Sequence, residues 1–441
     1  MTDEDFTLSR SRAANERLHA LVPGGAHTYA KGDDQYPEDL APVISHGRGA
    51  HVWDVDGNRY VEYGSGLRSV SLGHAHPRVV EAVRRELDRG SNFVRPSVVE
   101  LEAAERFLAT VPTAEMVKFA KNGSDATTAA VRLARAATGR PRVAVCADHP
   151  FFSVDDWFIG TTPMSAGVPA ATTGLTLSFP YGDLAATEEL LTRYEDEIAC
   201  LILEPAAHTE PPPGYLQGLR EVADRHGCVL VFDEMITGFR WSEAGAQGLY
   251  GVVPDLSTFG KALGNGFAVA ALAGRRALME RGGLRHPGDR VFLLSTTHGA
   301  ETHALAAAMA VQTVYVEEGV TARLHALGER LASGVREAAA GMGVGDHVVV
   351  RGRASNLVFA TLDGDGRPSQ AYRTLFLRRL LAGGVLAPSF VVSGALDDAD
   401  IEHTVEVVAE ACAVYRKALD AGDPTPWLGG RPVQPVFRRL V

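Results

Sequence analysis

The stretch CVLVFDEMITGF, residues 228–239, decides the fold. Its first five residues are all apolar and mostly β-branched or aromatic, which is typical of a central parallel strand covered on both faces. The apolar run then ends at two carboxylates, Asp233 and Glu234. The sequence therefore raises the question of why a buried strand should emerge at two acidic residues.

In the middle of the chain, a short apolar run, a polar loop and a helical segment follow one another repeatedly. Apolar runs recur in MVKFA, RVAVC, IACLIL and LSTF, with helical patterns between several of them. This alternation predicts a large α/β domain with a mostly parallel sheet over residues 76–322. Residues 1–75 predict a helix and a hairpin that turns at Asp56-Gly57. Residues 323–441 predict an α+β region, so we expect a smaller domain built from the N- and C-terminal parts.

Composition excludes several classes of protein. The 441 residues carry a formal charge of −11, which argues against nonspecific nucleic-acid binding because that requires a basic surface. No apolar stretch is long enough for a membrane span, and the acidic N-terminus lacks the apolar core of a signal peptide. The four cysteines form no C-x-x-C pair and are expected to be inert buried thiols, with no metal site. We therefore expect a cytoplasmic protein that acts on small molecules.

Several chemically useful residues fall where predicted parallel strands end. Ligands of open α/β sheets gather at the carboxyl ends of the strands. Glu204 follows one strand, Asp233 ends the next, and Lys261 follows a third in a glycine-rich loop. In KNGSDAT, Gly123 and Ser124 begin a helix, whose exposed N–H groups and dipole suit a phosphate.

A buried acid, a lysine and a phosphate cradle are together what pyridoxal phosphate requires. Its aldehyde bonds to a lysine, its ring nitrogen pairs with an ionised aspartate, and its phosphate needs N–H donors. Taken singly, each feature has a structural alternative: Asp233 as a helix cap, Lys261 as a solvated charge, and the NGSD segment as an ordinary N-cap. This cofactor gives Asp233 a role but does not obviously need Glu234.

The motifs LILEPA, VFDEMITGFR and STFGKALGNGFAVAALAG together resemble the class III aminotransferases, which are fold-type I pyridoxal-phosphate enzymes. The branch around glutamate-1-semialdehyde aminomutase is the most similar, and GHAHPRVVEAV and FLLSTTHGAETHALAAAMA extend the match over residues 22–404. The resemblance implies a homodimer with shared active sites. It also implies roles for matched residues. Lys261 would be the lysine bonded to the cofactor, Asp233 the partner of the ring nitrogen, and Met235 the residue under the ring. Gly123 and Ser124 would bind the phosphate, Thr296 would reach the phosphate in the neighbouring subunit, and Glu204 would lie near the cofactor hydroxyl.

The predicted substrate side departs from the aminomutase pattern. Aligned on DWFIG, the sequence HPFFSVDDWFIG places Phe151 to stack on the cofactor ring; the alternative, which we favour less, is that Phe151 and Phe152 both belong to the core. Lys31 stands where the aminomutase has a carboxylate-binding arginine, and lysine cannot reproduce that two-pronged contact. Leu67 replaces a tryptophan, with Arg68 beside it, and Tyr29 is a further candidate for substrate contact.

These departures favour an aminotransferase over the aminomutase. The expected reaction moves an amino group from an amino acid such as glutamate to a ketone or aldehyde. The acceptor could be an amino-sugar, aminocyclitol or natural-product intermediate. The alternatives are an isomerase, meaning an aminomutase or an epimerase at an amine-bearing carbon, and a nonenzymatic binding module that retains the fold.

Overall fold

The computed structural model describes residues 7–149 and 151–439. The chain divides into two compact units. Unit 1 combines Met1–His76 with Ala322–Arg438, and unit 2 combines Pro77–Thr321 with Arg439–Val441. The N-terminal segment thus packs into the same unit as the C-terminal part of the chain.

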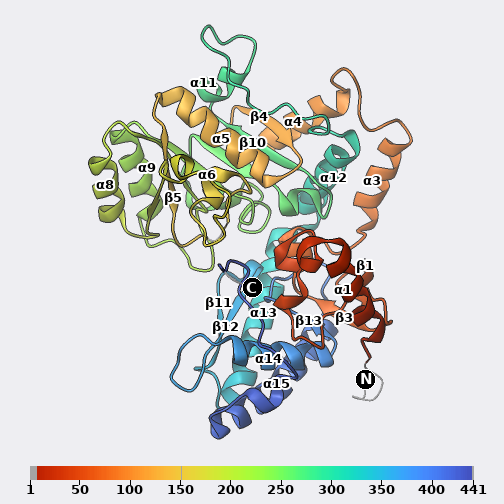
Figure 1. Ribbon diagram of the computed structural model, residues 1–441. Helices are drawn as coiled ribbons and strands as arrows, with labels where there is room; N and C mark the ends of the chain where they lie inside the picture. Colours follow the sequence, from red (N-terminus) through yellow and green to blue (C-terminus); the bar gives the residue numbers. More distant parts are fainter. Residues whose placement is uncertain (1–6, 150, 440–441) are drawn as a thin grey trace. The chain divides into compact units, whose positions relative to one another are not determined.

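Unit 2 is built on a seven-stranded sheet of order β4-β10-β9-β8-β7-β5-β6 (Figure 1). The strands are β4 (Met116–Ala120), β5 (Arg142–Cys146), β6 (Thr176–Phe179), β7 (Ile198–Leu203), β8 (Val229–Asp233), β9 (Leu256–Phe259) and β10 (Ala270–Gly274). From β6 to β9 all neighbours are parallel, whereas β10 is antiparallel to both β9 and β4. Every residue of β7 and β8 is buried, as the continuous apolar runs predict for central parallel strands.

Helices of unit 2 lie against this sheet and against one another. They are α3 (Pro77–Leu87), α4 (Val98–Thr110), α5 (Gly123–Thr138), α6 (Asp156–Ile159), α7 (Ala170–Thr173), α8 (Leu184–Arg193), α9 (Tyr215–Arg225), α10 (Gly245–Tyr250), α11 (Arg276–Met279) and α12 (Thr302–Glu318). The helix α5 crosses β7, β9 and β10, while α12 packs on α3 and α4. Asn122 and Asp125 form a capping box that starts α5, and Gly139, at φ +71°, ends it.

Unit 1 contains two smaller sheets. One has the order β1-β2-β3-β13, with β1 (Ile44–Arg48), β2 (His51–Asp54), β3 (Arg59–Glu62) and β13 (Val385–Leu386). The other pairs β11 (Val348–Arg351) with β12 (Val358–Thr361) in antiparallel register. The helices are α1 (Ser9–Leu21), α2 (Ser65–Arg68), α13 (Val320–Gly341), which begins at the end of unit 2, α14 (Gln370–Ala382) and α15 (Asp398–Ala421).

The predicted hairpin is present as β2 and β3, with Gly57 at φ +98° in its turn. The sequence did not predict β1, β6 or β13. The two residues of β13 pair in parallel with β3, more than three hundred positions away in the chain, so no local pattern marks them as a strand. All four cysteines are buried and unpaired, as expected, and burial raises the thiol pKa of Cys146 to about 12.

Candidate active site

Four neighbouring parallel strands place polar residues along one edge of the large sheet. The strands β5, β7, β8 and β9 are adjacent, so their carboxyl ends meet at this edge. His149 follows β5, Glu204 follows β7, Asp233 ends β8 and Lys261 follows β9. Asp233 lies opposite Thr258 in the register of β8 and β9.

Asp233 is a buried carboxylate with an unusually high pKa. Burial is the largest influence and raises its pKa to about 6, although the nearby Lys261 ammonium and two hydrogen bonds act in the opposite direction. Both hydrogen bonds reach Oδ1, from the Met235 N–H at 3.0 Å and from the Thr258 hydroxyl at 3.0 Å. The second oxygen, Oδ2, therefore remains for a further donor within the described part of the chain. A cation placed there would favour the ionised form and lower the pKa.

Met235 brings the start of α5 together with the loop that carries Lys261. Its side chain is buried, and a Cβ added to Gly123 would lie 3.0 Å from the Met235 sulfur. A Cβ added to Gly260 would lie only 2.6 Å from the same sulfur. Lys261 itself has a left-handed backbone at φ +48°, which a non-glycine residue rarely adopts. The structure thus groups Gly123, Met235, Asp233 and Lys261 in one place.

The first turn of α5 also holds the loop that carries Phe151. The Val154 N–H donates to the Ser124 hydroxyl at 3.1 Å, and the Thr127 hydroxyl donates to the Phe152 carbonyl at 2.8 Å. Phe152 is fully buried, whereas Phe151 is 42% exposed. Of the two rings, only Phe151 therefore keeps a substantial accessible surface for a ligand.

His149 is a site residue that the sequence reasoning missed. It is buried, and its Nδ1 accepts a hydrogen bond of 3.0 Å from the Glu204 backbone N–H. Burial lowers its pKa to about 4, so the imidazole is neutral and carries its proton on Nε2. Its ring packs edge-on against Phe152 with centroids 6.1 Å apart. His149 follows the apolar run RVAVC, so the strand-end rule that selected Glu204 could also have found it.

Glu234 has a structural role that explains the second carboxylate of the opening motif. Its two oxygens accept hydrogen bonds of 2.8 Å from the N–H groups of Ala246 and Gln247, in the first turn of α10, and Oε2 also accepts from the Thr237 hydroxyl. Burial raises its pKa to about 7, partly offset by these hydrogen bonds. Adjacent residues therefore point to different tasks, with Asp233 at the sheet edge and Glu234 capping a helix.

Thr296 lies in an exposed turn of unit 2. The Gly299 N–H donates to the Thr296 carbonyl, and the Asn92 side chain donates to the Thr297 carbonyl at 3.1 Å. Two residues beyond this turn, Glu301 pairs with Lys121, which immediately precedes the capping residue of α5. The role of Thr296 toward a neighbouring subunit stays a prediction.

The four predicted substrate residues belong to unit 1. Tyr29 and Lys31 lie in an exposed single turn, Tyr29–Lys31. Leu67 and Arg68 lie in α2, whose backbone is left-handed at φ +56° and +72°. Arg68 Nε donates to the Asn356 side chain at 2.8 Å, which fixes the direction of its guanidinium. Contact of these residues with a substrate stays a prediction.

Comparison with known proteins identifies the family. The sequence model of the class-III aminotransferases matches residues 33–386. The chain belongs to the class III aminotransferases. A glutamate-1-semialdehyde 2,1-aminomutase from Syntrophobacter fumaroxidans (strain DSM 10017 / MPOB) is 34% identical over 433 residues, covering 92% of this chain and 98% of that protein.

Solved structures agree with this class III assignment. An omega-transaminase from Sphaerobacter thermophilus superimposes with a TM-score of 0.83 at 27% identity, covering 92% of this chain and 99% of that one. A transaminase with pyridoxal phosphate bound superimposes with a TM-score of 0.85 at 26% identity, covering 95% and 99%. These matches confirm the predicted family resemblance, the fold-type I architecture and the pyridoxal phosphate cofactor.

The residues at the sheet edge fit the class III cofactor. Within the described part of the chain, the hydrogen bonds to the Asp233 carboxylate go to Oδ1, and a pyridinium N–H at Oδ2 would favour the ionised form. Lys261 lies close enough to influence the Asp233 pKa. The capped start of α5, a helix of 16 residues, supplies N–H groups and a positive dipole end for a phosphate. In residues 7–149 and 151–439, no three His, Cys, Asp or Glu side chains gather as metal ligands would. None of the helices there is long and apolar enough to cross a membrane.

Proposed function

We propose that this class III enzyme is an aminotransferase that moves an amino group from an amino-acid donor, such as glutamate, to a ketone or aldehyde acceptor. The observation that carries the proposal is the pair formed by a buried Asp233 and a nearby Lys261 at the ends of neighbouring strands. Pyridoxal phosphate, when bound, supplies a pyridinium ring that withdraws electrons from the carbon bearing the transferred nitrogen.

Lys261 and Asp233 have complementary tasks in this proposal. The Lys261 amine would hold the cofactor at rest, and after the donor amine has displaced it, the free amine would take a proton from the donor's α-carbon. Asp233 Oδ2 would accept a hydrogen bond from the ring nitrogen and favour its protonated form. The hydrogen bonds from Thr258 and Met235 to Oδ1 support this, because they fix the carboxylate and favour its ionised form.

The other predicted residues position the cofactor. Gly123 and Ser124 would offer N–H groups and a hydroxyl to the phosphate, and Phe151 and Met235 would pack against the ring. Glu204 would lie near the cofactor hydroxyl, and the bond from its own N–H to His149 holds its backbone in place. The absence of a side chain at Gly123 supports this arrangement, because a Cβ would come within 3.0 Å of the Met235 sulfur.

The substrate side supports a transaminase over an aminomutase. The chain has Lys31 and Leu67 in place of the arginine and tryptophan expected for the aminomutase. Loss of the carboxylate clamp favours an acceptor such as an amino-sugar, aminocyclitol or natural-product carbonyl. The two structural relatives above are described as transaminases, which also supports this choice.

The runner-up is an isomerase of the aminomutase type, which the 34% identity to the Syntrophobacter protein favours. The deciding experiment incubates the purified, cofactor-loaded protein with candidate amines, with and without a keto acid. A transaminase converts its cofactor to the amine form once per site and then stops until a carbonyl acceptor is added. Repeated turnover of a single amine without any keto acid would refute the transaminase and establish the isomerase.

We also propose that the enzyme is a cytoplasmic homodimer in which the partner subunit's Thr296 contacts the cofactor phosphate. The exposure of Thr296 on the single chain is compatible with a contact to a partner subunit. The four unpaired cysteines are compatible with the cytoplasm. Mixed dimers of Lys261→Ala and Thr296→Ala chains test it, since one of their two sites would hold both native residues. Activity that rises on mixing two impaired variants supports the shared site, and activity no higher than the average of the two contradicts it.

A further inference from the structure

A cavity in unit 1 gathers three arginines from two helices far apart in sequence. It has a volume of about 440 Å³ and is lined by Thr7, Leu8, Ser9, Arg12, Asp39, Leu40, Arg378, Arg379 and Ala382. Arg12 comes from α1, and Arg378 and Arg379 come from the last turns of α14. Among the described residues, Asp39 is the only carboxylate in the lining, so these residues give the cavity an excess of two positive charges. This is unusual in a chain whose net charge is −11.

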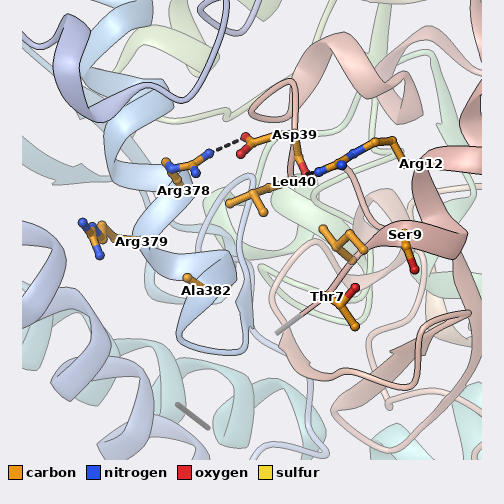
Figure 2. Close-up of a pocket in the computed structure, with 9 residues that line it drawn as sticks. Thr7, Ser9, Arg12, Asp39, Leu40, Arg378, Arg379 and Ala382 are labelled. Carbon is orange, nitrogen blue, oxygen red and sulfur yellow. Dashed lines mark hydrogen bonds and ion pairs between the residues drawn. The ribbon is translucent and has the colours of Figure 1, made fainter. Parts of the chain in front are cut away.

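Asp39 holds two of the arginines without using all of their donors. Its carboxylate pairs with Arg378, and its backbone carbonyl accepts a hydrogen bond of 3.4 Å from Arg12. Figure 2 shows these two guanidinium groups on either side of Asp39. Each guanidinium has five N–H donors, so both keep donors for a further acceptor.

Arg379 differs from the other two arginines in its contacts. Within the described part of the chain, its guanidinium makes no ion pair and no hydrogen bond. Its place in the last turn of α14 is favoured by the helix dipole, which accounts for one cation there. The dipole does not account for Arg12, which reaches the same cavity from the start of a different helix.

The helix terminus of α1 is not itself the source of the positive potential. The first-turn N–H groups of Arg10 and Ser11 are already bonded to the Asp56 carboxylate, at 2.7 and 2.8 Å. The groups left to bind a ligand are therefore the guanidinium groups and the hydroxyls of Thr7 and Ser9, which line the cavity in Figure 2.

We propose that this cavity binds a small organic dianion bearing phosphate or carboxylate groups. Arginine forks match both groups through paired N–H bonds, and two uncompensated charges match a dianion. Leu8, Leu40 and Ala382 give the cavity an apolar side against which a carbon skeleton packs. The volume lies within the range of about 300–1,000 Å³ that is usual for small-molecule sites. The cavity shares no lining residue with the proposed catalytic and substrate sites, so the inference goes beyond the proposed function.

Calorimetric titration of the cofactor-loaded protein tests the proposal. The probes are potassium phosphate and potassium succinate, each compared with potassium chloride at equal ionic strength. We expect saturable binding of one or both anions, with a rise in Tm because the ligand binds the folded chain. Binding of phosphate alone would assign a phosphoryl ligand, and binding of succinate alone a dicarboxylate. No saturable heat with either anion overturns the proposal.

Variants then locate the binding. Arg379→Gln and Arg12→Gln should each weaken binding by about tenfold or more, the usual effect of removing a charged hydrogen bond. Arg336→Gln, on the exposed face of α13, is the matched control and should leave binding unchanged. Binding that survives both cavity variants, or falls equally in the control, contradicts the assignment.

The chain's own acidic residues provide a competing occupant. Asp3, Glu4 and Asp5 precede Thr7 in the sequence. The titration is therefore repeated on a chain with these three residues changed to Asn, Gln and Asn. Binding to both chains supports a free ligand. Binding that occurs only in the neutralised chain would overturn the proposal, because it would assign the cavity to the chain's N-terminus.

Discussion

The sheet edge of unit 2 and the Ser65–Arg68 turn of unit 1 hold their candidate residues by different means. At the edge, Asp233 is placed by regular strand pairing and takes its hydrogen bonds from Thr258 and the next turn. In the turn, four consecutive residues have positive φ, and three of them are not glycine. Specific contacts hold this backbone, such as the bond from the Gly66 N–H to Glu62 at 3.2 Å.

The difference shows which candidate residues follow from sheet topology. Residues at the ends of parallel strands must converge, so the grouping of the candidate cofactor residues is a consequence of the fold. Residues on a strained turn are not placed by strand pairing, so local contacts must offset the backbone cost. Mutations in the two regions should therefore have different effects on activity and stability.

The largest effect is expected at Lys261. Lys261→Ala removes both the covalent attachment and the proton carrier, so the rate should fall by about 10⁴-fold or more. Loss of the visible absorbance of lysine-bound cofactor, followed alongside the rate, checks this. Lys417→Ala, an exposed lysine on α15, is the control and should behave as the native protein does. Native activity in the Lys261→Ala enzyme would contradict the role proposed for Lys261.

Asp233→Asn should lower activity and yet stabilise the cofactor-free protein. The amide cannot keep the ring nitrogen protonated, so the rate should fall by about 10²-fold. The folded-state pKa of about 6 lies above the ordinary value of 3.8, so folding favours the protonated acid. The apo protein should therefore gain stability as the pH falls from about 6 toward 4.

Asparagine cannot ionise, so Asp233→Asn removes the free-energy cost of burying a charged carboxylate. At pH 7, thermal melting of the apo Asp233→Asn protein should show a gain on the order of 1–3 kcal/mol. A melting temperature below that of the native apo protein would count against a desolvated, ionised Asp233.

Glu234→Gln should keep activity and cofactor absorbance, because Glu234 caps α10 and has no role at the cofactor. The amide NH₂ replaces an oxygen that accepts a backbone N–H of α10, so a buried donor loses its partner at a cost of about 1–3 kcal/mol. Glutamine also removes the burial penalty that raises the Glu234 pKa to about 7, so the apo protein should gain less stability than Asp233→Asn does. Asp233→Asn and Glu234→Gln are both nearly isosteric and are neighbours in sequence, so they serve as controls for each other. Equal losses of activity in the two would erase the distinction between them.

Much of this site was predictable from the sequence, and the reasons are local. Apolar runs that end at Glu204, Asp233 and Lys261 indicate strand ends, and the NGSD segment indicates a helix start. The division of labour between Asp233 and Glu234 was not predictable, because it depends on α10 returning twelve residues later. The left-handed turn was equally hidden, since only Gly66 among its residues signals positive φ.

His149→Leu should lower the stability of the protein without removing any group proposed to touch the cofactor. The Glu204 N–H would lose its buried acceptor, at a cost of about 1–3 kcal/mol in stability. His149→Asn keeps an oxygen acceptor at a similar reach and should recover part of that loss. Chemical denaturation of the two variants measures the difference. Equal stability of both would mean that the bond to Glu204 contributes nothing.

The smallest effect is expected in the turn at Arg68. At φ +72° a glycine is relaxed and an alanine is strained, so Arg68→Gly should be more stable than Arg68→Ala by about 1 kcal/mol. At an ordinary helical position the order is reversed. Both variants lose the hydrogen bond to Asn356, so the difference between their Tm values reports the cost of the left-handed backbone at position 68. An alanine variant that is the more stable of the two would show that the turn is not left-handed.

The most direct test of the central claim is chemical trapping of the cofactor on the native protein. Borohydride reduction of the protein loaded with pyridoxal phosphate, followed by proteolysis and mass spectrometry, identifies the lysine to which the cofactor is bonded. We predict that the phosphopyridoxyl mass appears on the peptide that contains Lys261. A label on any other lysine, or no label despite bound cofactor, would contradict the account of the sheet edge.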